Sequence, residues 1–231
     1  MHEVLISGKT SFKIQVPYKL YETGEGRAKP LIVYLHGYKQ NIAKFEKLVK
    51  EMMEIEAYHL FIQAPYPVYD ETGKTKVHEW GASWYLYDGE QQQFIKSLEL
   101  ASEFIQEVID NILPNINVSR ICLFGYSMGG YLGGYFMLSR WKHVNEAIII
   151  GARIKTEAFE GALEDAKHIK VLALHGSSDK SVLPKPQEKE IQILKEAGFT
   201  ANFIEVNSGH KLTKPHLNEA ITWLKQIGYQ S

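Results

Sequence analysis

The stretch "LFGYSMGGYLGG", residues 123–134, decides the fold of this chain because it sets one serine among glycines between a predicted strand and a predicted helix. Its first half, Gly125 to Gly129, matches the pattern G-x-S-x-G, in which a serine occupies a tight, strained turn at the edge of a sheet. Glycine two residues before and two after the serine removes side chains that would collide with neighbouring backbone. We therefore predict that Ser127 is a nucleophile at a helix N-terminus, where the helix dipole favours developing negative charge.

Short apolar runs predict further strands along the chain. Most of them are almost continuously apolar, which is typical of strands buried on both faces of a parallel sheet. They are "LIVYLHG" (31–37), "YHLFIQAP" (58–65), "RICLFG" (120–125), "EAIIIGA" (146–152), "KVLALHG" (170–176) and "ANFIEVN" (201–207). An earlier run, "KIQVPYKLY" at 13–21, alternates, and we expect it to be a half-exposed strand that pairs with "EVLI" at 3–6.

Apolar residues at helical spacing fill several of the gaps between these runs. The predicted helices cover 45–53, 94–109 with an end near Pro114, the stretch from "LPKP" to Gly198, and a last segment that starts near Thr213. This alternation predicts an α/β fold with a mostly parallel, doubly wound sheet and helices on both faces. Since no repeat or linker interrupts the pattern, we expect a single domain over residues 1–231.

The segment 64–90 does not follow this pattern, because it is rich in aromatic residues and shows no steady period. Long irregular loops in compact domains are usually lids or binding loops. We therefore expect this loop to line a pocket, with Trp80, Trp84 and Tyr85 as the substrate-binding residues.

A nucleophilic serine requires a base, and the base requires a carboxylate that orients it. Downstream of Ser127, Asp179 follows one predicted strand and His210 follows the next. In a parallel sheet these three residues leave the carboxyl edge together, and their order along the chain is the one found with this kind of serine turn. We predict a catalytic triad of Ser127, His210 and Asp179.

Other candidates for acid and base fit these roles less well. Asp165 and Glu164 lie in a charged, helix-like stretch and are expected to be solvated. We expect the remaining histidines to lie outside the triad: His36 and His175 at strand ends, His143 and His168 in polar surroundings, and His216 in the last helix, facing solvent.

The developing oxyanion needs two N–H donors. We predict the backbone amide of Met128, directly after the nucleophile, and that of Tyr38 in the loop "YLHGYKQN", where Gly37 permits close approach. The side chains of Gln40 and Asn41 are possible additional donors.

Composition excludes several other classes of protein. Lys+Arg at 26 against Asp+Glu at 27 leaves a net charge of −1 without a dense basic block, so no nucleic-acid partner is expected. No run approaches the roughly 18 apolar residues of a membrane span, and the start lacks the features of a secretory signal. The single cysteine, Cys122, is expected to be buried and inert and fits a cytoplasmic location. The scattered histidines predict neither a metal site nor another cofactor.

With these residues, the chain resembles the phospholipase/carboxylesterase family of α/β-hydrolases, which includes acyl-protein thioesterases. The likeness covers roughly residues 29–226 and rests on "YLHGY", "GYSMGG", "HGSSDKSVLP", "SGH" and "AITWLKQIG". The resemblance implies an α/β-hydrolase fold with little or no cap domain. It also implies a serine esterase or thioesterase whose triad is Ser127, Asp179 and His210.

We therefore expect hydrolysis of carboxylic esters or thioesters of small or medium acyl groups through an acyl-enzyme. Two alternatives stay open, because fold does not dictate function. One is a ligand-binding protein without catalysis, and the other is a peptidase or acyltransferase that uses the same triad. The sequence pattern specifies neither the acyl chain nor the oligomeric state.

Overall fold

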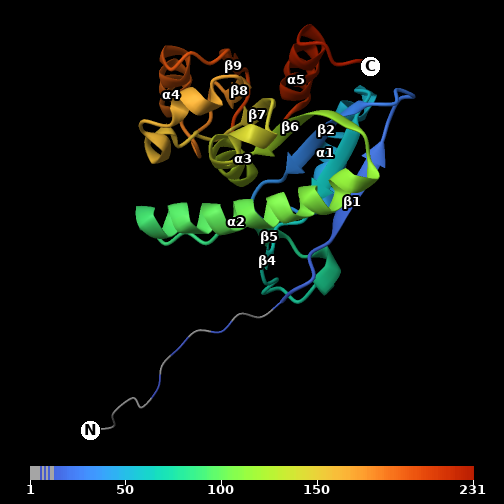
Figure 1. Cartoon of the computed structure of the whole chain (residues 1–231). Coiled ribbons are helices and arrows are strands. Elements are labelled where there is room, and N and C mark those ends of the chain that lie inside the picture. Colours follow the sequence, from blue (N-terminus) through green and yellow to red (C-terminus); the bar gives the residue numbers. More distant parts are fainter. Residues whose placement is uncertain (1–5, 7, 9, 11–12) are drawn as a thin grey trace.

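The computed structural model describes residues 6, 8, 10 and 13–231, and a seven-stranded sheet forms its centre (Figure 1). The strand order is β1-β3-β2-β6-β7-β8-β9. Strand β1 runs antiparallel to β3, and all other neighbouring pairs of this sheet are parallel. The strands are β1 Tyr18–Glu22, β2 Lys29–Leu35, β3 Tyr58–Ile62, β6 Val118–Tyr126, β7 Glu146–Ile150, β8 Lys170–Gly176 and β9 Ala201–Val206. The mostly parallel sheet confirms the fold class expected from the apolar runs.

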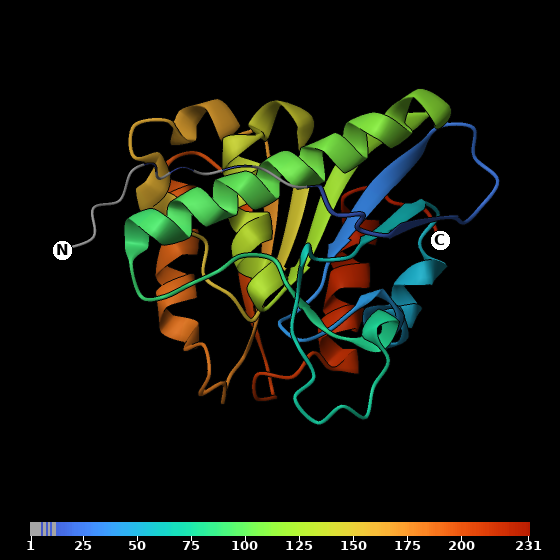
Figure 2. The same ribbon diagram turned by 90° about the horizontal axis from the view of Figure 1, so that it is seen from below.

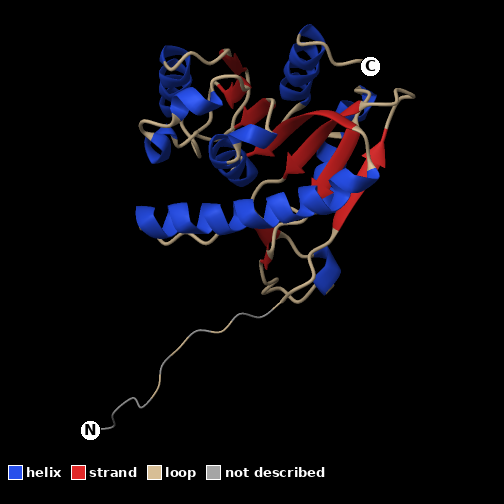
Figure 3. Cartoon of the chain, in the orientation of Figure 1, coloured by secondary structure: helices blue, strands red, loops and turns tan. Residues whose placement is uncertain are grey.

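Helices lie on both sides of the sheet, as Figure 3 shows. They are α1 Ile42–Leu48, α2 Gln91–Ile112, α3 Met128–Ser139, α4 Pro184–Glu196 and α5 Lys214–Gln226. Apolar side chains of α2, α3 and α4 form one buried cluster on one face of the sheet. Those of α1 and α5 form a second cluster on the other face. Because both faces are covered, the central strands are buried along their length, which explains their continuous apolar sequence.

Short 3₁₀ turns occupy several of the connections. The first follows α1 and forms the second half of the stretch predicted as one helix over 45–53. The connection between β7 and β8 contains two such turns, Thr156–Phe159 and Leu163–Ala166, and is too short to form a cap domain. The 3₁₀ turns are Lys50–Glu54, Val77–Glu79, Leu113–Asn115, Trp141–His143, Thr156–Phe159 and Leu163–Ala166.

The early strand is shorter than the sequence predicts. Strand β1 begins at Tyr18, and residues 13–17 have no regular secondary structure. Pro17 lacks the N–H that a strand residue donates to its neighbour, although its carbonyl accepts a hydrogen bond from the amide of Gln63 at 3.0 Å. The expected partner strand at 3–6 falls largely outside the described residues.

The aromatic segment 64–90 contains a small antiparallel pair, β4 Tyr66–Pro67 with β5 Ala82–Ser83. Figure 1 shows this pair below α2, and Figure 2 shows the segment as a long teal loop. At its tip, both carboxylate oxygens of Asp70 accept hydrogen bonds, from Thr72 and from Thr75. The segment is thus organised, although the sequence shows no period.

The structure also bears on the single cysteine and on membrane-spanning helices. Cys122 in β6 is completely buried, and burial raises the pKa of its thiol well above the ordinary value, which leaves it protonated as expected for an inert thiol. None of the helices in the described part of the chain is long and apolar enough to span a bilayer.

Candidate active site

Ser127 sits in a strained turn between β6 and α3. Its φ angle of 53° lies in the left-handed region, which residues other than glycine rarely adopt. Its N–H donates to the carbonyl of Ile150 in β7 at 2.8 Å, which fixes the turn to the neighbouring strand. A Cβ at Gly125 would stand 2.5 Å from the carbonyl oxygen of Gly129, and one at Gly129 would stand 2.1 Å from that of Leu35. The two flanking glycines are therefore required by backbone contacts, as the pattern predicts.

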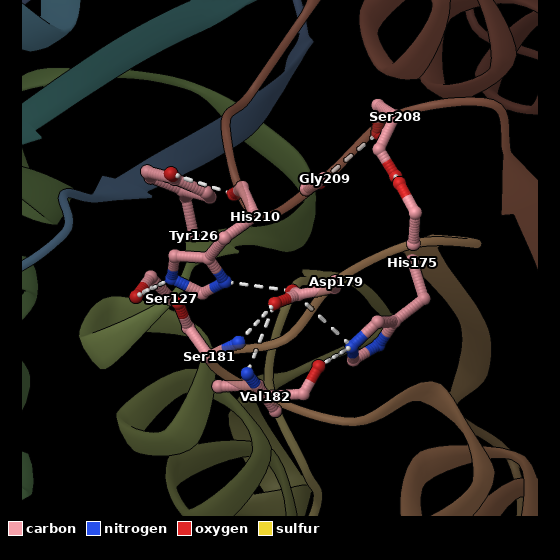
Figure 4. A network of polar contacts seen from close by, with 10 residues as sticks. Tyr126, Ser127, His175, Asp179, Ser181, Val182, Ser208, Gly209 and His210 are labelled. Atoms are coloured by element: carbon pink, nitrogen blue, oxygen red, sulfur yellow. Dashed lines mark hydrogen bonds and ion pairs between the residues drawn. The ribbon is translucent and has the colours of Figure 1, made fainter.

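The structure brings the three predicted triad side chains together at the carboxyl edge of the sheet (Figure 4). The Oγ of Ser127 lies 2.8 Å from Nε2 of His210. The Nδ1 of the same imidazole lies 2.7 Å from Oδ2 of Asp179. Asp179 follows β8 and His210 follows β9, so each residue is delivered by the loop after its own parallel strand. The arrangement allows a proton to pass from the serine to the histidine while the carboxylate orients the ring.

Asp179 is almost completely buried, yet its carboxylate is well supplied with donors. Its Oδ1 accepts hydrogen bonds from the amides of Ser181 at 2.8 Å and Val182 at 3.0 Å. Burial by itself would raise the pKa of Asp179, but hydrogen bonds from Val182, His210 and Ser181 outweigh it and keep the pKa below its ordinary value. The carboxylate is therefore charged at neutral pH and able to stabilise an imidazolium on His210.

A second contact holds the loop of His210 to the turn that carries Ser127. The phenol of Tyr126, the residue before Ser127, donates to the backbone carbonyl of His210 at 2.9 Å. The two rings lie 5.8 Å apart between centroids. A single residue of the turn thus fixes the loop that carries the base.

The backbone amides of the two predicted oxyanion donors, Met128 and Tyr38, have no acceptor among the described residues. Met128 is the first residue of α3, so its N–H belongs to the free N-terminal turn of the helix. Lys39, which follows Tyr38, has φ 59° and donates its N–H to the carbonyl of Ala82 at 3.1 Å. This contact secures the Tyr38 loop against β5.

The side chains of Gln40 and Asn41, predicted as possible additional donors, take part in other hydrogen bonds. The Oε1 of Gln40 accepts a hydrogen bond from the amide of Gly37 at 2.8 Å. Asn41 caps α1 by accepting from Lys44, and its side-chain amide donates to the carbonyl of Glu79 at 2.9 Å. Both side chains organise the loop, and the amide of Asn41 is not free to serve an oxyanion.

The predicted substrate-binding aromatics occupy different places. Trp84 has no exposed surface, and its indole donates to the backbone carbonyl of His36 at 2.7 Å. Tyr85 is also buried and packs edge-on against Phe94, with 4.9 Å between ring centroids. Trp80 is half-buried and donates to the carbonyl of Thr75. Trp80 lines a pocket, which is described next.

This pocket has a volume of about 770 Å³ and a mostly apolar wall. The N-terminal segment, the end of β3 and the loop before β5 form it, with Ile14, Val16, Tyr66, Val77, Trp80 and Ala82 among its lining residues. Ala82 also bonds to the Tyr38 loop, because its N–H donates to the carbonyl of Gln40 at 2.8 Å. Strand β5 therefore contacts both the pocket and the loop that carries Tyr38, a predicted oxyanion donor.

Two further histidines, His216 and His36, are buried away from Ser127. His216 was expected to face solvent, and this is wrong: it is buried at the start of α5, where its Nδ1 pairs with the hydroxyl of Thr213 at 2.8 Å. The residue caps its own helix, and burial lowers its pKa. His36 is buried as well; its Nδ1 donates to the carbonyl of Gly37 and its Nε2 accepts from the amide of Ala64. Neither histidine contacts Ser127.

Sequence reasoning missed two residues that touch the triad. One is Tyr126, whose hydroxyl contact with His210 depends on the fold of a distant loop. The other is His175, which ends β8 and lies against Asp179, with 3.6 Å between its Nε2 and Oδ2 of the carboxylate. The sequence did offer one signal for this contact, since His175 lies at the end of the predicted strand that precedes Asp179. In residues 13–231, no three His, Cys, Asp or Glu side chains are grouped so that they could hold a metal ion.

Comparison with known proteins identifies the family of the chain. A model of the phospholipase/carboxylesterase family matches residues 18–227. A probable carboxylesterase SOBER1-like protein of Arabidopsis thaliana is 31% identical over 144 residues, 56% of this chain, and the match spans only 51% of that relative. Carboxylesterase SOBER1 of the same plant is 25% identical over 224 residues, covering 86% of this chain and 91% of the relative.

A solved structure extends the likeness to the fold. The crystal structure of esterase PE8 superposes with a TM-score of 0.75 at 20% identity and covers 93% of this chain and 100% of its own. This likeness confirms the α/β-hydrolase fold. Since the family model covers nearly the whole of the described sheet and its helices, the chain belongs to the phospholipase/carboxylesterase family of α/β-hydrolases.

Proposed function

We propose that the protein hydrolyses carboxylic esters or thioesters of small or medium acyl groups, with Ser127 as nucleophile, His210 as base and Asp179 as the residue that orients the base. The observation that carries this proposal is the unbroken chain of two short contacts, 2.8 Å from Ser127 to His210 and 2.7 Å from His210 to Asp179. Family membership supports the reaction class.

In the first half of the reaction, His210 accepts the proton of Ser127 as its oxygen attacks the substrate carbonyl. Asp179 stabilises the imidazolium that forms. The amides of Met128 and Tyr38 donate to the oxyanion of the tetrahedral intermediate, a contribution that is typically worth about 10²–10³ in rate for each donor. The intermediate collapses, His210 gives its proton to the leaving alcohol or thiol, and the acyl group stays on Ser127.

In the second half, water takes the place of the leaving group. His210 removes a proton from the water, which attacks the acyl-enzyme, and then returns the proton to Ser127 as the acid leaves. The side chain of His210 is 26% exposed, so water reaches it without opening of the fold. We assign the substrate-binding role to Trp80 and the apolar pocket that it lines, as the surface available beside the Tyr38 loop.

A reactive fluorophosphonate and an ester panel test this proposal. We expect the probe to attach to Ser127, and we expect Ser127→Ala to lose about 10⁴-fold or more in kcat without unfolding. Ser102→Ala is the matched control, since Ser102 is buried in α2 and bonds only to the carbonyl of Leu98. The panel consists of p-nitrophenyl esters of rising chain length and the corresponding thioesters.

Three outcomes separate the alternatives. Absence of an adduct at Ser127, with no turnover of any ester, favours a ligand-binding protein. An adduct combined with cleavage of peptides or transfer of acyl groups to added alcohols favours a peptidase or acyltransferase. A Ser127→Ala variant with near-normal turnover refutes the nucleophile assignment.

A further inference from the structure

His175 is a buried, ionisable residue that the proposed mechanism does not use. It lies near the end of β8 and has no exposed surface. Its Nε2 lies 2.8 Å from the carbonyl oxygen of Val182 and 3.6 Å from Oδ2 of Asp179. Because a carbonyl oxygen only accepts, Nε2 carries a proton in this structure. Figure 4 shows Asp179 between two imidazoles, with His210 on one side and His175 on the other.

The other nitrogen of this imidazole has no partner. Nδ1 of His175 is buried and makes no hydrogen bond with any described residue. An unpaired buried polar atom destabilises the folded state, a cost that an apolar side chain of similar size would avoid. Phe203 lies beside this imidazole, with 6.3 Å between ring centroids, so an apolar residue would have an apolar neighbour here. Packing alone therefore does not account for a histidine here.

The protonated nitrogen acts on the turn that presents Asp179. By donating to the carbonyl of Val182, it fixes that residue to the end of β8. The amides of Val182 and Ser181 point at Oδ1 of Asp179. If Val182 moved, these two donors would move with it, and the carboxylate would rotate about its bond to the backbone.

The same nitrogen also lies near the carboxylate oxygen that pairs with His210. Oδ2 of Asp179 accepts from His210 at 2.7 Å, and Nε2 of His175 lies 3.6 Å from the same atom. This distance is too long for a hydrogen bond. The N–H dipole nevertheless lies close to a charged oxygen, and both side chains are buried, where electrostatic interactions are stronger than in water.

We propose that His175 is a positioning residue of the triad, which holds the Asp179–Val182 turn through its Nε2–H and thereby fixes the carboxylate in the orientation that His210 requires. This inference rests on the proposed function, since it assigns His175 a role only if Asp179 orients a catalytic base. It acts through Asp179 and does not contact the substrate.

Kinetics of two His175 variants test the role of the N–H. Leucine removes the donor, and we expect His175→Leu to lower kcat about 10–100-fold, the effect typical of a small misplacement of a catalytic group, with KM changed less than about twofold. Glutamine carries an amide N–H at nearly the position of Nε2. We expect His175→Gln to recover most of the lost kcat.

A double-mutant cycle shows whether the effect passes through Asp179. Asp179→Asn should lower kcat by about 10⁴-fold, because the ring of His210 is then no longer held in the required tautomer. In the Asp179→Asn background, His175→Leu should lower kcat by no more than about twofold further, since interacting residues are not additive. The matched control is His59→Leu, which removes another completely buried histidine, on β3, and should leave kcat unchanged.

Each outcome decides for or against the proposal. Normal kcat in a folded His175→Leu variant overturns it, and so does a full His175→Leu effect in the Asp179→Asn background. If the leucine variant does not fold, His175→Gln is compared with His175→Asn, whose shorter amide cannot reach Val182; equal kcat values in these two variants also overturn it. If Asp179→Asn itself retains normal activity, the proposed function fails, which is a distinct result.

Discussion

Tyr126 donates a hydrogen bond from its hydroxyl to the backbone carbonyl of His210 at 2.9 Å, so the residue before the proposed nucleophile holds the proposed base. The bond joins β6 to the loop after β9, across 84 residues of sequence. We expect Tyr126→Phe, which removes this bond alone, to lower kcat about 5- to 10-fold, the equivalent of roughly 1 kcal/mol. Steady-state kinetics on a short ester measure the effect. Tyr135→Phe, whose lost hydroxyl bonds to Glu99 in α2, is the control and should keep normal kcat.

Glycine at position 129 is required because α3 lies against β2. A Cβ there would stand 2.1 Å from the carbonyl oxygen of Leu35, which cannot shift without disturbing the strand. We expect Gly129→Ala to lose several kcal/mol of unfolding free energy, or not to fold. At Gly133, one turn later, the nearest atom to a Cβ is the flexible end of Ile149 at 3.3 Å. Gly133→Ala should therefore remain within about 1 kcal/mol of the parent protein in urea unfolding, because alanine also favours the helix. Similar losses in both variants would contradict this explanation.

The indole of Trp84 supports the backbone of the loop that carries Tyr38. Its bond to the carbonyl of His36 is completely buried. In Trp84→Phe that carbonyl loses its donor, and we expect the unfolding free energy to fall by about 1–3 kcal/mol. KM for short esters should stay within about twofold of the parent value. A raised KM with unchanged stability would instead support the substrate-binding role expected from the sequence.

Two buried histidines make the stability of the protein depend on pH. Burial lowers the pKa of both His36 and His59 to about 4. In the unfolded chain these groups have a pKa of about 6.5, so between pH 6.5 and 4 the unfolded state binds protons that the folded state does not. Stability is therefore complete above pH 6.5 and falls as the pH is lowered through this window, by about 2 kcal/mol for each histidine at pH 5.

Urea unfolding between pH 7.5 and 5 measures this dependence. His59→Leu should be less stable at neutral pH, because it loses its contacts with Tyr34 and Thr23, but its stability should fall less steeply on the acid side. If the stability of His59→Leu falls as steeply below pH 6.5 as that of the parent protein, His59 does not contribute to the pH dependence of stability.

The sequence predicts the central strands and the relative order of the triad for a physical reason. Strands covered on both faces must be apolar along their length, and parallel strands deliver their following loops to one edge. Asp179 and His210 could therefore be placed beside Ser127 from chain order alone, and the two contacts of 2.8 Å and 2.7 Å agree with that expectation.

The sequence did not reveal features that depend on packing between distant parts of the chain. His216 caps its own helix with an imidazole in the place where a glutamate is the usual signal, so the pattern around Thr213 did not reveal its burial. The aromatic character of 80–85 was evident, but no period indicated that Trp84 turns inward while Trp80 lines a pocket. The contact of His175 with the Asp179 turn depends on the path of residues 179–182, which no local pattern encodes.

Under the proposed mechanism, the order of the strands along the chain also sets when the site becomes complete during synthesis. The nucleophile turn follows β6, whereas the base lies 83 residues further along, after β9. At about 5–20 residues per second, the ribosome releases Ser127 several seconds before His210. Throughout that interval the Ser127 hydroxyl lacks the imidazole that lies beside it in the folded chain. Under the proposed mechanism, a nascent chain therefore cannot cleave esters until β9 has paired and His210 has reached Ser127.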